Sequence, residues 1–157
     1  MATIKRKTAR DRQFGGFTPY GNVSTLVYLL KTNATGAVID SDSTAAVASG
    51  DVIDLGELPE GMRLDDAQIL IKTGMTATVT GSLGFKYVDT DSTEVPQDAA
   101  YFINAGDMAT AGRLRANTGK LVTLPKPARL ILTTGVAANA KASDIKVIVS
   151  GELTGPR

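Results

Sequence analysis

Residues 50–73 read GDVIDLGELPEGMRLDDAQILIKT, and this stretch decides the fold class. Its first half is an apolar run that ends at Leu-Pro-Glu-Gly, residues 58–61, a typical turn sequence. In its second half apolar side chains recur at every second position, at Ala67, Ile69 and Ile71. A period of two places one face in a core and the other in water, as in an antiparallel sheet. The stretch therefore predicts a strand, a tight turn and a second strand.

Two further stretches repeat the pattern. Between residues 78 and 87, Val, Gly, Leu, Phe and Tyr alternate with Thr, Ser, Gly and Lys, which is hard to reconcile with a helix. Gly81 and Gly84 within it indicate a bend or a β-bulge. Residues 145–153 alternate in the same way, so both stretches are predicted strands with a defined inward face.

The remaining segments give weaker signals. Residues 25–31 are apolar on both faces, which predicts a strand covered on both sides. Residues 99–103 fit a strand or a short helix, and residues 107–116 are interpreted as an excursion from the sandwich. Shorter strands are expected at residues 37–39, 121–124 and 129–133. About eight strands without helix–strand alternation predict an all-β antiparallel β-sandwich, with a jelly roll as the first choice, although the strand order stays open.

Composition excludes several kinds of chemistry. The chain has 157 residues, which fits one domain, and it contains no cysteine and no histidine. Without cysteine the chain can form neither disulfides nor thiolate metal sites. Without histidine it lacks the commonest general base and the commonest metal ligand. Aromatic residues make up 5% of the chain and tryptophan is absent, which argues against a sugar-binding groove or a base-stacking surface. We predict no catalytic residue, no cofactor and no metal, and hence not an enzyme.

The N-terminal residues have a different character. Residues 1–13 hold five basic residues and one acidic residue, a net of +4, whereas the remainder holds twelve basic and fifteen acidic residues, a net of −3. Gly, Pro and isolated aromatic residues follow up to residue 22. The basic residues are not followed by the apolar segment that is typical of a secretory signal. We therefore expect an extended basic arm at 1–22 and a β-sandwich domain at 23–157, and we expect the body to fold without the arm. The candidate contact residues in the arm are Lys5, Arg6, Lys7, Arg10, Arg12, Phe14, Phe17 and Tyr20.

Three interpretations of the arm remain open. It is a tail that aids solubility, a nucleic-acid-binding segment, or a clasp on an acidic protein surface. The third is slightly favoured because arginine pairs well with carboxylates and aromatic rings fill apolar pockets. Nucleic acid is less favoured because the body is acidic and has few rings, and no membrane partner is expected, since no apolar run is long enough to span a bilayer.

Pairs of acidic residues are the other candidates for chemistry. Asp40 and Asp42, like Asp89 and Asp91, have the spacing of calcium-loop ligands. Neither pair continues with the glycine and distant glutamate of a helix–loop–helix calcium site, so turn formation is the preferred interpretation. Two carboxylates would also suffice for glycoside hydrolysis, but no spacing singles out such a pair.

Three segments together resemble the small capsid decoration, or cement, proteins of tailed bacteriophages. They are GDVIDLGELPEGMRLDDAQILI, TVTGSLGFKYVD and DIKVIVSGEL, and the similarity runs loosely from residue 23 to residue 153. The resemblance implies a β-sandwich on the outside of the head that binds major capsid protein, forms dimers or trimers and has no active site. It also implies a virion location on the capsid surface, with assembly in the host cytoplasm. A fibre or baseplate module that binds a surface glycan is the alternative, and a glycan array would separate the two.

Overall fold

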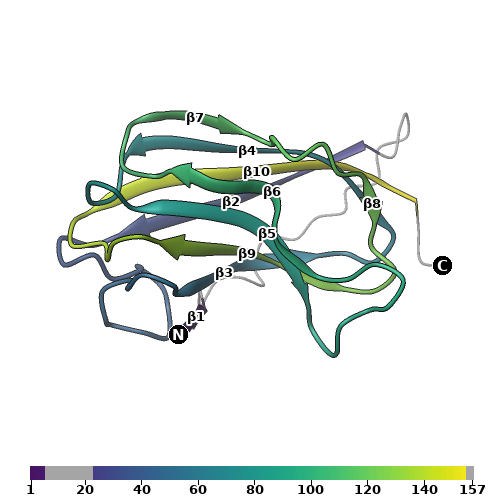
Figure 1. Cartoon of the computed structure of the whole chain (residues 1–157), viewed down its shortest axis with the longest axis horizontal. Helices are drawn as coiled ribbons and strands as arrows, with labels where there is room; N and C mark the ends of the chain where they lie inside the picture. The colour runs from purple at the N-terminus through teal and green to yellow at the C-terminus, as the bar shows by residue number, and fades with distance from the viewer. Residues whose placement is uncertain (6–22, 155–157) are drawn as a thin grey trace.

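The computed structural model describes residues 1–5 and 23–154, and these form a two-layer β-sandwich (Figure 1). Every element among the described residues is a strand, so the prediction of an all-β sandwich is confirmed. The strands are β1 (Thr3–Lys5), β2 (Val23–Thr32), β3 (Val52–Leu58), β4 (Met62–Thr73), β5 (Thr80–Tyr87), β6 (Asp98–Asp107), β7 (Gly112–Arg115), β8 (Val122–Thr123), β9 (Ala128–Gly135) and β10 (Ser143–Leu153).

The strand order is that of a jelly roll. The first sheet has the order β1-β3-β9-β5-β6, and the second sheet has the order β2-β10-β4-β7, with β8 paired to β4. Thus β2 pairs with β10, β3 with β9, β4 with β7 and β5 with β6, and successive pairs alternate between the sheets. Figure 1 shows β7, β4 and β10 along the upper side and β9, β3 and β1 along the lower side. Between the described strands all pairings are antiparallel except that of β1 with β3.

The core lies between the sheets and consists of the inward side chains of alternating strands. On β5, Leu83 and Phe85 are fully buried, and on β10 so are Ile145, Val147 and Val149. Both sets have the parity that the sequence predicts. One extended aliphatic and aromatic cluster results, which is the main source of stability in a domain of this size.

Glycines on β5 allow the irregular pairing with β6. The register shifts between Gly81 and Leu83, and again between Leu83 and Phe85. The predicted irregularity at Gly81 and Gly84 is therefore confirmed. The extra residues of β6 carry Tyr101 and Phe102 into the core, where the Phe85 and Tyr101 rings meet edge to face at 5.4 Å.

The prediction for residues 25–31 is wrong in one respect. Leu26, Tyr28 and Leu30 point into the core, but Val27 is 44% exposed. β2 forms the edge of the second sheet within the described part of the chain, and only its inner face is covered. The alternation was hidden because its outward positions are partly aliphatic as well.

Residues 107–116 are not an excursion from the sandwich, and of the two alternatives for residues 99–103 the structure shows the strand. β6 belongs to the first sheet and β7 pairs with β4 in the second. The backbone of residues 74–75 meets that of residues 108–109, since Met75 N–H donates to Met108 O at 2.8 Å. The glycines and polar residues of this segment suit its turns and its exposed edge strand, and they conceal its pairing from a sequence pattern.

The first five residues also differ from the expected arm. β1 pairs in parallel with β3, and Ile4 beside Ile53 is only 2% exposed. The backbone of Lys5 bonds to Asp42 through both its N–H and its carbonyl oxygen, at 2.9 Å each. A truncation of residues 1–22 would thus remove a strand together with any arm.

Candidate interaction surface

The outward face of the first sheet carries a compact group of charged side chains. Arg129 on β9 lies between Asp54 and Glu57 of β3. Its Nε donates to the two Asp54 carboxylate oxygens at 3.0 and 2.9 Å, and its Nη1 donates to Glu57 Oε1 at 3.0 Å. The side chains of Arg129 and Asp54 are only 16% and 4% exposed. Because the Asp54 carboxylate is almost fully desolvated, loss of Arg129 would leave it buried without a compensating charge.

Tyr28 connects this group to the second sheet. Its hydroxyl, on β2, donates to the backbone oxygen of Glu57 at 2.6 Å. Burial raises the pKa of Tyr28 well above its usual range, while the nearby Arg129 charge lowers it in part. The hydroxyl therefore stays neutral and remains a donor at all physiological pH values. Its hydrogen bond to Glu57 links β2 of the second sheet to β3 of the first.

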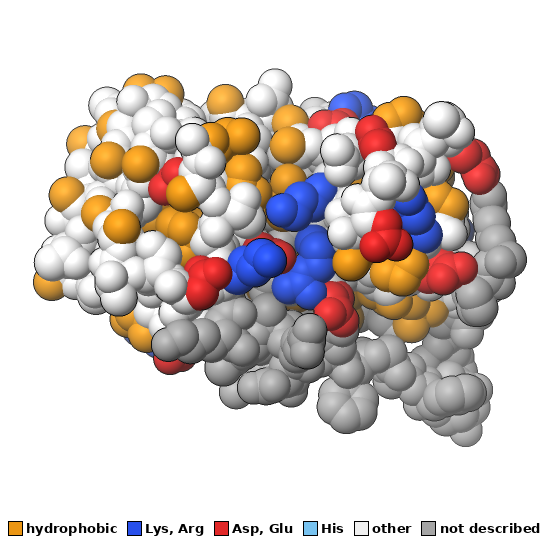
Figure 2. All heavy atoms as spheres, turned by 90° about the horizontal axis from the view of Figure 1, so that it is seen from below, with side chains coloured by type: hydrophobic (Ala, Val, Ile, Leu, Met, Phe, Trp, Pro, Cys, Tyr) orange, Lys and Arg blue, Asp and Glu red, His pale blue; other side chains and the backbone are white. Residues whose placement is uncertain are grey.

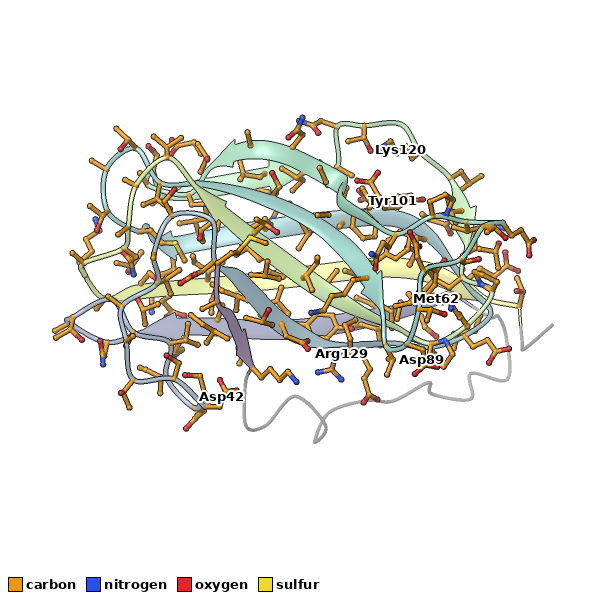
Figure 3. The ribbon with its side chains drawn as sticks, turned by 60° about the horizontal axis from the view of Figure 1, so that its bottom comes forward. Asp42, Met62, Asp89, Tyr101, Lys120 and Arg129 are labelled. Atoms are coloured by element: carbon orange, nitrogen blue, oxygen red, sulfur yellow. The ribbon has the colours of Figure 1, made fainter. Side chains whose placement is uncertain are left out.

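Lys5 is the one predicted contact residue within the described residues. In the register of β1 and β3 it lies beside Asp54, and its side chain is exposed. Figure 2 shows Lys and Arg side chains gathered at the middle of the lower face, with acidic side chains around them. Figure 3 places Arg129 on the same side of the sandwich, away from Tyr101 and Lys120. Lys5 thus joins a mixed-charge surface and not a purely basic one.

The other seven predicted contact residues lie outside the described residues. They are Arg6, Lys7, Arg10, Arg12, Phe14, Phe17 and Tyr20. Their role in binding stays a prediction.

Comparison with solved structures relates this fold to bacteriophage capsids. A chain from the capsid of Ralstonia phage GP4 superposes with a TM-score of 0.67 at 16% identity, covering 98% of this chain and 99% of the other. A chain from the capsid asymmetric unit of cyanophage Pam1 superposes with a TM-score of 0.58 at 18% identity, covering 92% and 95%. No protein-family model matches the sequence, and no curated protein matches it. What these chains share with this protein is a fold over nearly their whole lengths.

One acid of each pair noted in the sequence, Asp42 and Asp91, binds backbone groups. Asp42 holds β1 in place, as described above, and Asp91 Oδ1 accepts the N–H groups of Ser92 and Gln97 at 2.8 and 2.7 Å. Among residues 1–5 and 23–154, no three acidic side chains are placed to hold a metal ion together. Nor do these residues include a helix with the length and apolar character of a membrane span. Asp91 therefore stabilises its own turn, whereas Asp42 makes a long-range contact with β1.

Sequence reasoning missed the Arg129 group and the outward side of β2. A signal for the first was present, since Asp54 interrupts the apolar run 52–58 and an acid at such a position needs a partner. A signal for the outward side of β2 was also present. Thr25, Val27, Leu29 and Lys31 lie on one face of the strand, and the polar residues at the two ends of this series, Thr25 and Lys31, indicate that the face is exposed.

Proposed function

We propose that this protein is a structural component of a bacteriophage virion that binds the outside of the assembled capsid lattice and stabilises the head. The observation that carries the proposal is the full-length likeness to a chain of the Ralstonia phage GP4 capsid. That chain is close to this one in length, because the superposition covers nearly all of both. The sequence resemblance to decoration proteins supports the outer position.

The physical character of the domain supports the same proposal. A sandwich with one continuous core and sheets fastened by the Tyr28–Glu57 hydrogen bond suits a load-bearing part. The described residues contain no arrangement of acids suited to metal chemistry. Reinforcement of a shell requires stiffness and many repeated contacts, and no catalysis.

In this proposal the N-terminal residues contact the shell. The basic residues Lys5, Arg6, Lys7, Arg10 and Arg12 bind carboxylates, and the three aromatic residues that follow fill apolar pockets. Each contact is weak because an extended segment loses entropy when it binds. A dimer or trimer facing many identical subunits would raise the overall affinity through effective concentration.

Co-sedimentation with assembled shells of the phage that encodes the protein tests this function. The protein should sediment with shells and stay in the supernatant with free capsid subunits. Shells with the protein bound should also keep their DNA to a higher temperature than bare shells. Equal binding to shells and to free subunits, or no binding to shells, would rule the proposal out.

The contribution of the arm needs a variant that leaves β1 in place. Replacing Arg6, Lys7, Arg10 and Arg12 by Gln removes four charges and keeps Ile4 in the core. We expect lower shell occupancy at an unchanged melting temperature. Wild-type occupancy of this variant would show that the arm charges are not contacts.

A further inference from the structure

An aliphatic patch lies on the outward face of the second sheet. It consists of Val27 and Leu29 on β2, Ile148 on β10 and Leu70 on β4, and we call it the β10 patch. Ile148 is the direct neighbour of Val27, while Leu29 and Leu70 flank the next outward position of β10. Val27 is 44% exposed, the other three are partly exposed, and Val23 at the end of the same face is 66% exposed. Several aliphatic side chains that stay partly exposed on one sheet face are typical of a surface that another molecule covers.

Basic side chains border the β10 patch. Lys146 stands between Leu29 and Leu70, and Arg113 on β7 is the next neighbour of Leu70. Within the described part of the chain, neither Lys146 nor Arg113 forms an ion pair. Two exposed cations beside aliphatic groups are therefore available to an incoming anionic group.

The remaining charges around the patch are paired but still sum to a positive value. Lys31 and Lys72 share Asp144, each with its Nζ 3.8 Å from Oδ2, and Arg115 Nη1 lies 3.4 Å from Asp66 Oδ2. Five basic and two acidic side chains thus surround the patch, a net of +3. The described residues together hold twelve basic and fifteen acidic side chains, a net of −3. The surroundings of the patch therefore carry a net positive charge, although the described residues as a whole carry a net negative charge.

We infer that the β10 patch and its basic border form the docking face for an acidic protein surface with an apolar centre. This inference rests on the proposed function, under which the partner is a subunit of the capsid shell. The aliphatic centre would be buried against the partner, while Lys146 and Arg113 would pair with carboxylates at the rim. Complementary charges at the rim set the orientation and speed the association more than they add affinity.

Two other occupants fit less well. A nucleic acid would gain little from the aliphatic centre, because bases stack on aromatic rings and the patch has none. A second copy would bring two faces of net charge +3 together, and a two-fold axis along β10 would also oppose two Lys146 side chains and two Asp144 side chains. Like charges in contact are unfavourable, so an acidic partner of a different kind is the better match.

A charge-reversal pair tests the docking face. Lys146→Glu with Arg113→Glu changes two exposed side chains, removes no ion pair with another described residue and leaves the core untouched. The matched control is Lys141→Glu, compared with Lys146→Glu alone, because it makes the same change of charge at an exposed lysine outside the patch. Circular dichroism and the melting temperature of both should equal those of the wild type.

The readout is the dissociation constant for assembled shells. The test pair should weaken binding by about tenfold or more, because like charges would then meet at the rim, whereas the control should stay within about twofold of wild type. Val27→Asp should weaken binding as well through the aliphatic centre. Wild-type binding by both the test pair and Val27→Asp would overturn the docking face while leaving the proposed function intact. If the wild-type protein does not bind assembled shells, both the proposed function and the docking face are wrong.

Two measurements separate the other occupants. Sedimentation velocity of the free protein should show the same oligomer for wild type and test pair; dissociation in the test pair would mean that a second copy covers the face. Titration with duplex DNA should show weak binding that the test pair alters little. DNA binding as tight as shell binding, lost on charge reversal, would overturn the acidic-protein assignment.

Discussion

At Gly84 the backbones of β5 and β6 approach so closely that no side chain fits. A Cβ atom at this position would lie 2.0 Å from the carbonyl oxygen of Asp98 and 2.4 Å from the carbonyl carbon of Ala99. Both obstructing atoms belong to the backbone, so no side-chain rotation can relieve the contact. This residue therefore determines where the register of β5 and β6 shifts.

We expect Gly84→Ala to lower the free energy of unfolding by about 2–3 kcal/mol, because the added methyl group forces the two strands apart. Urea unfolding followed by circular dichroism measures the change. Lys86→Ala, on the same strand but outward, should alter stability by no more than about 0.5 kcal/mol. Equal urea midpoints for the two variants would contradict the steric account.

Tyr101 makes the stability depend on alkaline pH. Its hydroxyl donates to the backbone oxygens of Leu64 and Lys120, at 3.1 Å each, and burial raises its pKa to about 12. The folded pKa lies above the unfolded value near 10, so the unfolded chain releases this proton first as the pH rises. The contribution of Tyr101 is thus fully present below about pH 10 and declines as the pH rises toward 12.

Tyr101→Phe isolates that contribution. We expect the wild type to be the more stable of the two at pH 9, because the variant leaves two backbone oxygens without this donor. The difference in free energy of unfolding should shrink between pH 9 and pH 11.5. A difference that is constant over this range would show that the hydroxyl does not titrate as described.

At the scale of elements, the three-residue strand β1 is an integral part of the first sheet. Its central residue Ile4 is buried against the first sheet, and its ends are fixed by the Asp42 and Asp51 carboxylates, which accept the N–H groups of Lys5 and Ala2 at 2.9 and 3.0 Å. The strand is thus an anchor that precedes residues 6–22. Its pairing partner β3 lies some fifty residues later in the sequence.

Ile4→Ala should lower the free energy of unfolding by about 2–4 kcal/mol, since it removes buried methyl groups and leaves a cavity. Thr3→Ala, whose side chain is exposed, is the matched control and should be close to neutral. Thermal and urea unfolding measure both. Equal stability of the two variants would show that β1 contributes nothing to the core.

In the whole molecule the pairing is almost entirely long-range. β2 pairs with β10 across more than a hundred residues, and β3 pairs with β9 across about seventy. Loops of this length must close before the paired strands stabilise each other, which makes folding slow. Local helical structure that could form first is absent from the described residues.

We therefore expect refolding from urea to take milliseconds to seconds, as in other β-sandwiches. Stopped-flow circular dichroism or tyrosine fluorescence would follow it, since the chain has no tryptophan. Complete refolding in less than about 0.1 ms would contradict a fold that depends on these pairings. A variant at the β5–β6 contact, such as Gly84→Ala, would then report whether that pair forms early or late.

Side-chain parity could be predicted from the sequence because alternation along one strand is a local property. Every second residue in 79–87 and 145–153 faces the core, as the sequence patterns indicate. The two-layer all-β class follows from such patterns. The basic N-terminal residues could be named from charge alone, although of these only Lys5 is placed by the structure. The absence of cysteine and histidine likewise excludes disulfides and histidine-based catalysis, a conclusion that needs no knowledge of the fold.

The tertiary structure decided the rest, because it depends on which strands pair. The jelly-roll order, the place of β1 and the inclusion of β6 and β7 all result from hydrogen bonds between distant segments. The β10 patch and the Arg129 group have the same origin, since each gathers side chains from several strands. A linear pattern specifies the inward face of each strand, but the neighbours of that strand are selected by the free energy of the whole assembled core.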